Sequence, residues 1–258
     1  MEKQTILGFD FISAHQVEEV ATILINTKEH NRNNALPFLI TPNAAQIVEF
    51  EKKEKKLKEK LSKAAFILPD GQPIVWLSKM LGKPLKKRLT GSDLFPALWK
   101  LVQSESKRAY FIASHLELKE RIEQEYPLAK VYVPPFFDAQ DENTLNKIIA
   151  ETSDEIVQWQ PQFIFVGLGF PKQELISLYL YQKMITQTEK PLFLLLGASF
   201  EFYYQLKSRA PRWIQNIGFE WLYRFAQEPK RMWRRYTIGN IAFIIICLKE
   251  LLKKNKKS

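Results

Sequence analysis

Short apolar runs alternate with longer amphipathic stretches through the first 200 residues, and this alternation constrains the fold most strongly. Nearly continuous apolar strands separated by helices are typical of a parallel sheet that is buried on both faces. The sequence therefore predicts an α/β fold in which a mostly parallel sheet is covered by helices on both faces. The six runs predicted as strands are Pro37–Thr41, Ala64–Gly71, Arg108–Ser114, Lys130–Phe137, Gln162–Gly169 and Pro191–Phe202.

The densest run of charged residues lies on a helix predicted between the first two strands. This helix follows Pro42 and Asn43, and its exposed part is Glu51–Lys63. The lysines of the run are matched by glutamates, which is typical of a solvated helix face and not of a binding patch. Another helix is predicted over Pro73–Gly82, and Pro171 occupies a favourable first-turn position of the helix after the fifth strand.

Polar and small residues gather where the predicted strands end. In open α/β sheets, ligands bind at the carboxyl ends of the strands. The residues that these ends present are Thr41, Asn43, Asp70, Gly167, Gly169, Gln173 and Ser199. Asp70 directly precedes Gly71, so it is either a general base presented to a cleft or part of an Asp-Gly turn, and the dipeptide alone leaves both open.

Two further turns are candidates for binding an anion. Gly167–Glu174 places two glycines between a strand and a helix start, as phosphate-binding loops do, and Gly197 lies in another small-residue turn. The first turn lacks the third glycine of the dinucleotide fingerprint and the Lys-Ser/Thr ending of a P-loop, so it supports ATP or NAD only weakly. An ordinary strand–helix turn has the same pattern. Arg88 precedes a helix start capped by Ser92 or Asp93, and it either meets a phosphate or is solvated.

The net charge of +10 is confined to the end of the chain. Residues 1–204 contain 25 basic and 25 acidic side chains, whereas residues 205–258 contain 13 basic and 3 acidic ones. Arg209–Tyr236 is arginine-rich and holds three of the six tryptophans, and its helical pattern is broken at Gly218 and Pro229. The composition therefore divides the chain into an N-terminal domain, residues 1–204, and a basic helical appendage, residues 205–258.

The sequence is compatible with three kinds of binding partner for this appendage. Arginines interleaved with aromatic residues, followed by the apolar run Ile241–Leu248 and a lysine cluster, favour helices that lie in the interface of an anionic membrane. Nucleic acid is the competing polyanion, but an apolar run of this kind does not contribute to binding in a nucleic-acid groove. No nucleic-acid partner is therefore expected. The third alternative is an arm that packs on a partner subunit.

The composition argues against a metal centre, a disulfide and a membrane span. Cys247 is the single cysteine, and the histidines His15, His30 and His115 lack metal-ligand spacing. We therefore expect neither a metal nor another cofactor. The N-terminus has no secretory pattern, and the Ile241–Leu248 run is much shorter than the roughly 20 residues that span a bilayer. These features predict a cytoplasmic protein.

Six segments carry a resemblance to a known family. They are TPNAAQIVEF, LPDGQPIVW, RLTGSDL, FVGLGFPKQE, GASFEF and RAPRWIQNIGFEWLYRFAQEPKRMWRRY. In order and spacing they resemble the WecG/TagA/CpsF glycosyltransferase family (glycosyltransferase family 26). The likeness runs from about Gly8 to Tyr236, and its weight lies in the long last segment, because the DG and GLG pieces alone prove little.

The resemblance implies an inverting, metal-independent transferase with a Rossmann-like domain. Such enzymes move a sugar, typically N-acetylmannosamine or its uronic acid, from UDP to a polyprenyl-diphosphate-linked sugar. They act at the cytoplasmic membrane face in making teichoic-acid linkage units, enterobacterial common antigen, capsule or exopolysaccharide. The implied partners are a UDP-sugar donor, a polyprenyl-diphosphate-sugar acceptor and an anionic membrane surface. A site that depends on a detachable arm is also compatible with a homo-oligomer.

Carried over by motif position, the resemblance gives roles to individual residues. Asp70 is the implied general base on the acceptor hydroxyl. The residues implied to contact the sugar and acceptor are Thr41, Asn43, Arg88, Gln173 and Phe137. The nucleotide loops are implied at Gly167, Gly169, Gly197, Ser199 and Glu201. Contacts to diphosphates and membrane are implied for Arg209, Arg212, Arg224 and Arg231. Without a metal cluster, such arginines and helix N-termini must supply the charge that stabilises departing UDP, and Arg212 or Arg224 is expected to act there.

Four departures from the family pattern lie near the expected nucleotide and sugar subsites. The usual Gly-Gly pair after the third strand is replaced within Ile112–His115, and the His/Asp-Gly-Tyr-Phe turn is replaced by Pro134–Phe137. The DGxG motif reads Asp70–Pro73, and the Asp of the GSFDF-type segment is Glu201. Donors of glucose or galactose type therefore become alternatives to N-acetylmannosamine.

Two functions from other classes compete with sugar transfer. One is a catalytically inactive relative that serves as a membrane-bound assembly subunit, and retention of Asp70 with Thr41, Asn43 and Gln173 argues against it. The other is a Rossmann oxidoreductase. It would need a full glycine fingerprint and an acidic residue about 20 positions later, and the sequence has neither.

Overall fold

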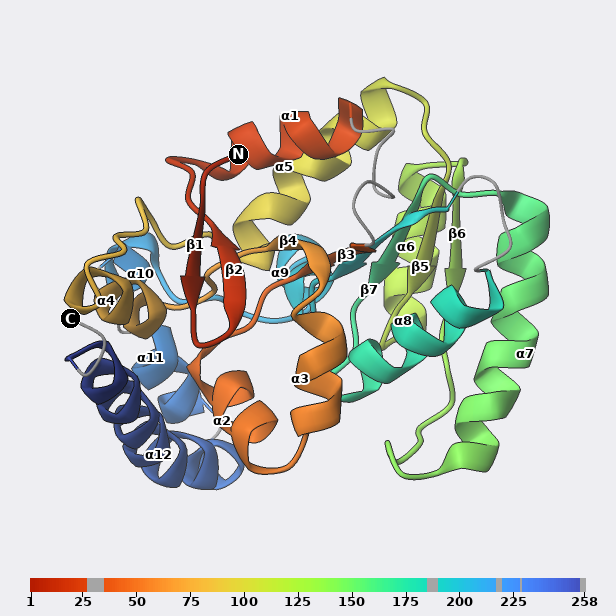
Figure 1. Cartoon of the computed structure of the whole chain (residues 1–258). Coiled ribbons are helices and arrows are strands. Elements are labelled where there is room, and N and C mark those ends of the chain that lie inside the picture. Colours follow the sequence, from red (N-terminus) through yellow and green to blue (C-terminus); the bar gives the residue numbers. More distant parts are fainter. Residues whose placement is uncertain (27–34, 185–189, 217–219, 228, 256–258) are drawn as a thin grey trace.

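A six-stranded parallel sheet forms the centre of the molecule (Figure 1). The computed structural model describes residues 1–26, 35–184, 190–216, 220–227 and 229–255. Every neighbouring pair of strands in this sheet is parallel, as the apolar runs predict, and the spatial order is β4-β3-β8-β7-β5-β6. The strands are β3 (Leu36–Ile40), β4 (Ala64–Ile67), β5 (Ala109–Ile112), β6 (Ala129–Tyr132), β7 (Phe163–Val166) and β8 (Leu192–Leu195).

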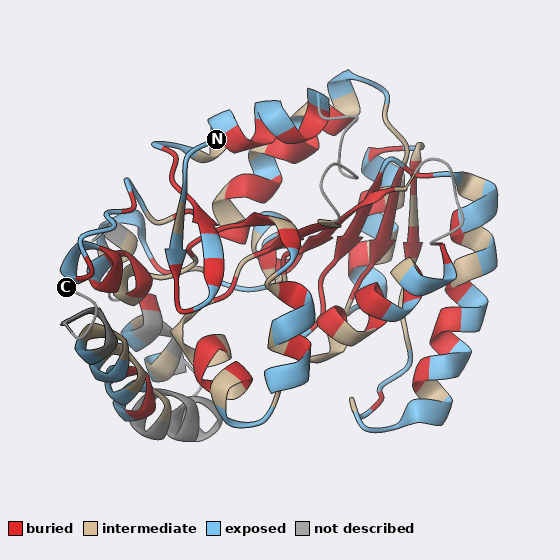
Figure 2. Ribbon diagram, in the orientation of Figure 1, coloured by how far each residue is buried: buried red, intermediate tan, exposed pale blue. Residues whose placement is uncertain are grey.

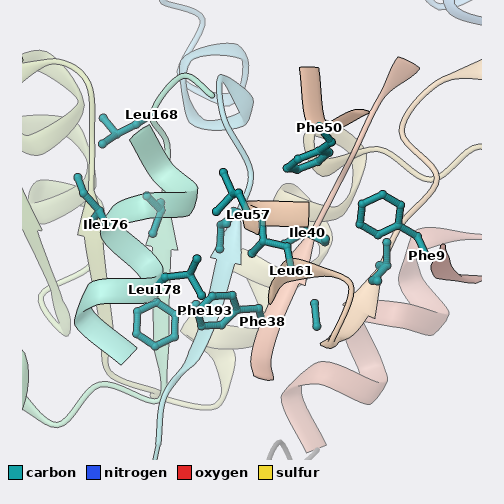
Figure 3. Packing of buried hydrophobic residues seen from close by; sticks show 14 of the residues in the cluster. Phe9, Phe38, Ile40, Phe50, Leu57, Leu61, Leu168, Ile176, Leu178 and Phe193 are labelled. Carbon is teal, nitrogen blue, oxygen red and sulfur yellow. The ribbon is translucent and has the colours of Figure 1, made fainter. Parts of the chain in front are cut away.

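Helices cover both faces of the sheet because its strands are apolar on both sides (Figure 2). Within β3, Phe38 and Ile40 belong to one buried cluster and Leu39 to the other, as the period of two in a strand requires. The first cluster, drawn in part in Figure 3, includes side chains of α2 (Ala44–Lys52), α3 (Lys55–Leu61), α7 (Glu142–Trp159) and α8 (Lys172–Lys183). The second includes side chains of α1 (Val17–Asn26), α5 (Gly91–Ser104) and α6 (Leu116–Glu125).

The sixth predicted strand is shorter than the sequence suggests. It leaves the sheet at Leu195, and the chain then turns at Gly197, whose φ of +56° lies in the left-handed region that glycine adopts without strain. Ser199–Tyr203 continue as the short helix α9. The apolar residues that looked like the end of a strand therefore pack as a helix, and Phe200 is fully buried.

The charged helix predicted between the first two strands is two helices. Helix α2 ends at Lys52, and α3 begins at Lys55 with a new direction (Figure 1). Leu57 and Leu61 lie one turn apart on α3 and are both buried in the first cluster. The lysine-rich side of α3 is solvated, as predicted. The next predicted helix is present as α4 (Gln72–Met80).

An N-terminal hairpin adds a second, two-stranded sheet that the apolar pattern did not predict. Strands β1 (Lys3–Ile6) and β2 (Phe9–Ile12) are antiparallel and pair Ile6 with Phe9. The two residues between them, Leu7 and Gly8, both have positive φ, as a two-residue hairpin turn requires. The hairpin buries its phenylalanines against the edge of the main sheet, where β2 contacts β4.

The appendage is helical, as predicted, and packs on the N-terminal domain. Its described elements are α10 (Arg212–Asn216), α11 (Glu220–Gln227) and α12 (Pro229–Asn255), and the predicted break at Gly218 lies outside the described residues. Helix α12 lies along α2 (Figure 1) and buries Ala242 and Phe243 in the first cluster. Among the described residues, no helix is long and apolar enough to cross a membrane.

Candidate active site at the carboxyl edge of the sheet

The connections of the parallel strands diverge between β5 and β7. These strands are neighbours, but the chain leaves β5 through α6 toward β6 at the edge of the sheet and leaves β7 through α8 toward β8 on the opposite side. Divergent connections of this kind open a crevice at the carboxyl ends of the strands. The loops that border it begin at Ala113 and Gly167. The predicted nucleotide loops lie at this edge.

Helices α2, α5 and α8 are among those that begin at the same edge, with their N-termini directed toward it. Asn43 caps α2, because its side chain accepts from Gln46 N at 3.2 Å while Gln46 Oε1 accepts from Asn43 N at 3.0 Å. Thr90, rather than Ser92 or Asp93, caps α5 by accepting from the backbone N–H of Asp93 at 3.0 Å. Helix α8 begins at Lys172. The partial positive charge of these helix ends favours a bound anion.

Asp70, Asn43 and Thr41 are brought to one corner of the edge. Asp70 follows β4, and a Cβ placed on the next residue, Gly71, would lie 3.9 Å from Asn43 Cβ. Gly71 has φ of +134°, so the turn after Asp70 needs glycine. Thr41 follows β3, and its hydroxyl lies 3.4 Å from the carbonyl oxygen of Leu195 in β8. The carboxylate, the amide and the hydroxyl therefore come from adjacent strands.

Gln173 and Glu174 form a buried polar pair at the start of α8. Gln173 Oε1 accepts from Gly197 N at 3.1 Å, and Gln173 Nε2 donates to Glu174 Oε1 at 2.9 Å. Glu174 Oε2 has no hydrogen-bond partner among the residues that the structure describes, and it borders a small cavity also lined by Thr41 and Gln46. Burial raises the pKa of Glu174, and the hydrogen bond from Gln173 lowers it by less. The pKa is therefore raised overall, to about 7. Sequence reasoning missed Glu174, although it lies in the same motif.

The glycine loops have different surroundings. A Cβ on Gly167 would lie 2.4 Å from the Phe200 ring, so this glycine is required by close packing of α9 against the sheet. A Cβ on Gly169 would have no other atom within 4 Å, so this position faces open space. Ser199 is buried and donates to the carbonyl oxygen of Leu196 at 2.6 Å. Gly169 therefore has room for a ligand, whereas Gly167 has none.

Glu201 is the centre of a charged cluster beside the crevice. It is 4% exposed and accepts from Ser114 Oγ at 2.8 Å and Lys207 Nζ at 2.6 Å, while His115 Nε2 lies 3.0 Å away. Burial raises its pKa, but the bonds from Lys207 and Ser114 and the nearby charges outweigh burial, so the pKa is lowered overall. Two departures from the family pattern, at Ser114–His115 and at Glu201, thus contact each other.

The two phenylalanines after β6 have opposite surroundings. Phe137, which the resemblance places among the substrate contacts, is buried in the first cluster, whereas Phe136 is 98% exposed. Lys172 Nζ lies 4.7 Å from the centroid of each ring, which is cation–π distance. Phe136 is therefore the aromatic side chain of this turn that a ligand can reach.

Two arginines meet the acidic side chains at the boundary between the domain and the appendage. Arg88 Nη1 donates to Glu220 Oε2 at 3.0 Å, and Arg209 Nη1 donates to Asp93 Oδ1 at 2.8 Å. The pKa of Asp93 is lowered overall, because burial raises it less than Arg209 and Thr90 lower it. Sequence reasoning singled out both arginines but missed Glu220, whose place inside the specific C-terminal segment was the available signal.

The remaining predicted arginines differ in what the structure describes of them. Arg212 is exposed at the start of α10. Arg224 lies in α11 and Arg231 in α12, and their side chains lie outside the described residues. Among the described residues, no three His, Cys, Asp or Glu side chains form a cluster that could hold a metal ion.

The fold and the site define a doubly wound α/β protein with helix N-termini and polar side chains at the carboxyl edge of its sheet, where proteins of this class bind their ligands. Residues 4–257 match the model of the glycosyl transferase WecG/TagA/CpsF family. The chain belongs to this family and is a glycosyltransferase. The resemblance carried by the six sequence segments is thereby confirmed.

Two curated relatives support the same family. One, from Bacillus spizizenii strain W23, is named N-acetylglucosaminyldiphosphoundecaprenol N-acetyl-beta-D-mannosaminyltransferase and is 30% identical over 240 residues, covering 91% of this chain and 87% of the relative. One from Staphylococcus aureus strain MW2 has the same name and is 28% identical over 262 residues, covering 98% of this chain and 96% of the relative. The likeness therefore includes both the domain and the appendage.

Proposed function

We propose that this glycosyltransferase moves a sugar from a UDP-sugar to a polyprenyl-diphosphate-linked sugar, with inversion and without a metal ion. The acceptor class is supported by the names of the two relatives, which specify N-acetylglucosaminyldiphosphoundecaprenol. The observation that supports the mechanism is the position of Asp70 at the carboxyl edge of the sheet, directly before Gly71, whose Cβ direction points to Asn43 at 3.9 Å. The product would be a lipid-linked intermediate of a cell-surface polysaccharide or teichoic acid.

Asp70 would act as the general base. Its carboxylate takes the proton of the acceptor hydroxyl while that oxygen forms the new bond to the anomeric carbon of the donor. The bond between this carbon and the UDP oxygen breaks, and UDP leaves with the electron pair. Because the acceptor attacks from the face opposite UDP, the configuration inverts. Thr41, Asn43 and Gln173 would position the two sugars.

The departing diphosphate needs positive charge at this edge. The N-termini of α2, α5 and α8 would supply part of it. Arg88 and Arg209 are held nearby by carboxylates, and the exposed Arg212 is free of the ion pairs that the structure describes for those two. We assign the direct contact with UDP to Arg212, with Arg224 and Arg231 completing the basic surface of the appendage.

The donor sugar is an N-acetylmannosamine-type hexose in this proposal, with glucose or galactose types as alternatives. The relatives' names specify an N-acetylmannosaminyl group, which supports the first choice. The contact of Ser114 and His115 with Glu201 supports the alternatives, because it places a charged cluster where the family has small residues and an Asp. A changed hydrogen-bonding set is a common way to select between hydroxyl patterns.

One face of α12 would contact an anionic membrane at its cytoplasmic side. Its exposed apolar side chains recur every three or four residues, so they form one stripe along the helix, and they are Ile241, Ile244, Ile245, Leu248 and Leu252. Basic residues of the appendage would add attraction to anionic lipids. A membrane concentrates the bound molecules at one surface, which favours their association. The proposal therefore includes a homo-oligomer, and cross-linking on liposomes tests for it.

A donor screen tests the proposed function. The purified full chain is incubated with each of several UDP-sugars and a short-chain polyprenyl-diphosphate-N-acetylglucosamine, and the product mass is measured. We expect one hexose-type residue to be added, at the same rate with and without EDTA. Loss of the reaction with EDTA and its rescue by Mg²⁺ or Mn²⁺ would contradict the metal-independent mechanism. No transfer from any donor by folded protein would favour the inactive assembly subunit.

A further inference from the structure

One carboxylate of the appendage, that of Glu220, pairs with an arginine of the N-terminal domain near the candidate general base. Glu220 begins α11, and its side chain is 11% exposed. Its Oε2 accepts from Arg88 Nη1 at 3.0 Å, and its Oε1 lies 3.7 Å from Arg209 Nε. Arg88 precedes α5 in the domain, and Arg209 lies in the appendage, between α9 and α10. Glu220 therefore contacts cations on both sides of the boundary.

Arg209 is also held by the first turn of α5. Its Nη1 donates to Asp93 Oδ1 at 2.8 Å, and its Nη2 lies 3.4 Å from Thr90 Oγ1. Burial lowers the pKa of Arg209, but the bond and charge of Asp93, then the charges of Glu220 and Asp70, raise it overall. Leu89 N donates to the carbonyl oxygen of Pro69 at 3.1 Å, so the backbone next to Arg88 lies against the backbone next to Asp70, and the network lies near the proposed base.

The burial of this network makes each partner depend on the others. Arg88 and Arg209 have side chains that are 15% and 19% exposed, so water solvates their charges poorly. Removing one partner of a buried pair leaves the other charge uncompensated, which costs far more than breaking an exposed pair. Neutral Glu220 would therefore favour separation of α11 from the domain, because separation returns both guanidinium groups to water.

We propose that Glu220 is a positioning residue that docks the appendage onto the N-terminal domain and holds Arg88 and Arg209 beside Asp70. When the appendage is docked, its basic residues complete the basic side of the site. When it is undocked, Arg88 lacks the carboxylate of Glu220 as a partner. The effect on sugar transfer rests on the proposed function, whereas docking itself does not.

Tryptic cleavage tests the docking. The linker between α9 and α10 contains Lys207 and Arg209, and cleavage after Arg209 requires this side chain to leave Asp93 and Glu220. In full-length Glu220→Gln we expect cleavage after Arg209, mapped by mass, to be faster by on the order of tenfold or more. The charge-swapped pair Arg88→Glu with Glu220→Arg should recover protection relative to either single variant.

Activity tests the positioning. On the lipid-linked acceptor we expect Glu220→Gln and Arg88→Gln each to lower kcat/KM on the order of tenfold or more, and the double variant to be little worse than either one. The swapped pair should regain protection without regaining activity, because Arg88 itself serves the site. Glu117→Gln is the matched control, since it breaks an exposed Arg–Glu pair of 2.7 Å in α6, and both readouts should stay unchanged.

Two outcomes would overturn the proposal. One is wild-type protection from trypsin in Glu220→Gln, and the other is a double variant whose loss is the product of the two single losses. If the wild-type chain transfers no sugar, the proposed function fails, but the cleavage pattern still decides whether Glu220 docks the appendage. The two failures are therefore distinguishable.

Discussion

The N-terminal domain and the appendage differ in how they bury apolar residues and in how they distribute charge. The domain hides its apolar residues on both faces of a sheet and balances 25 basic with 25 acidic side chains. The appendage carries the whole net charge of +10, and α12 buries Phe243 on one side while it leaves Ile241, Ile244 and Leu248 about half or more exposed on another. Helix α12 therefore has one apolar side packed on the domain and another that is exposed, as the proposed contact with a membrane requires.

The boundary between the two regions changes how the net charge is interpreted. Lys207 donates to Glu201 of the domain, and Arg209 donates to Asp93. These cations face inward and are compensated by carboxylates, so only part of the positive excess is available to lipids or diphosphates. The appendage therefore uses part of its positive charge for attachment to the domain.

The largest expected effect lies entirely in the domain. Asp70→Asn keeps the shape of the side chain but removes the proton acceptor, so kcat for sugar transfer should fall by about 10²- to 10⁴-fold. The measurement is product formation at saturating donor and acceptor. Asp138→Asn is the control, since Asp138 is an exposed aspartate after β6. Near-normal turnover of Asp70→Asn would remove Asp70 from the role of base.

The next effect tests whether membrane contact belongs to the appendage alone. Glutamine at four exposed positions of α12 should abolish flotation with anionic liposomes, because each lost apolar contact is worth about 1 kcal/mol. The positions are Ile241, Ile244, Ile245 and Leu248. Turnover of a water-soluble acceptor should persist. Glutamine at three exposed apolar positions of the domain is the control, at Leu116, Val157 and Tyr179. Flotation lost only in the control would reverse the assignment.

A smaller effect concerns the buried acid of the domain. The pKa of Glu174 is raised from 4.5 to about 7, so between these pH values the unfolded chain ionises while the folded chain keeps its proton. The free energy of unfolding should therefore fall by about 3 kcal/mol as the pH rises from about 4.5 to about 7. Urea unfolding at several pH values measures this fall. Glu174→Gln should lack it, and Glu142→Gln should retain it. An unchanged pH profile in Glu174→Gln would assign the titration elsewhere.

The smallest effect lies at the boundary. Lys207→Met removes one of the groups that hold Glu201, whose side chain is 5% exposed, while Ser114 and His115 remain. We expect the free energy of unfolding to fall by about 1 to 2 kcal/mol, since a hydrogen bond to a charged group is lost. Thermal unfolding measures it, with Lys147→Met at an exposed pair in α7 as the control. Equal melting temperatures for both variants would mean that Lys207 adds nothing to the boundary.

Much of the fold follows from local pattern. The apolar runs give six strands and the parallel sheet, because a strand buried on both faces needs apolar residues at every position. The hairpin of β1 and β2 was missed because polar residues interrupt its strands, so neither forms a continuous apolar run. The extended sixth strand was wrong beyond Leu195, since apolar residues such as Phe200 fit a buried helix as well as a strand.

The candidate site was predicted only as a set of strand ends. Sequence spacing identifies Asp70, Gln173 and Arg209, but it gives no distance between them. Glu174 and Glu220 were missed because a glutamate in a helical sequence looks solvated, and burial of its carboxylate is a property of the packed structure. Phe137 was favoured over Phe136, although only the fold shows which of two adjacent rings faces the core.

The sequence by itself determined the parallel sheet, the family and the location of the positive charge. These properties follow from periodicity, motif order and composition, because none of these depends on how distant segments of the chain pack together. The tertiary structure alone decided that Arg88, Arg209, Asp93 and Glu220 form one network across the boundary. Pairing between residues more than 100 positions apart depends on how the appendage packs on the domain, and no local pattern encodes it.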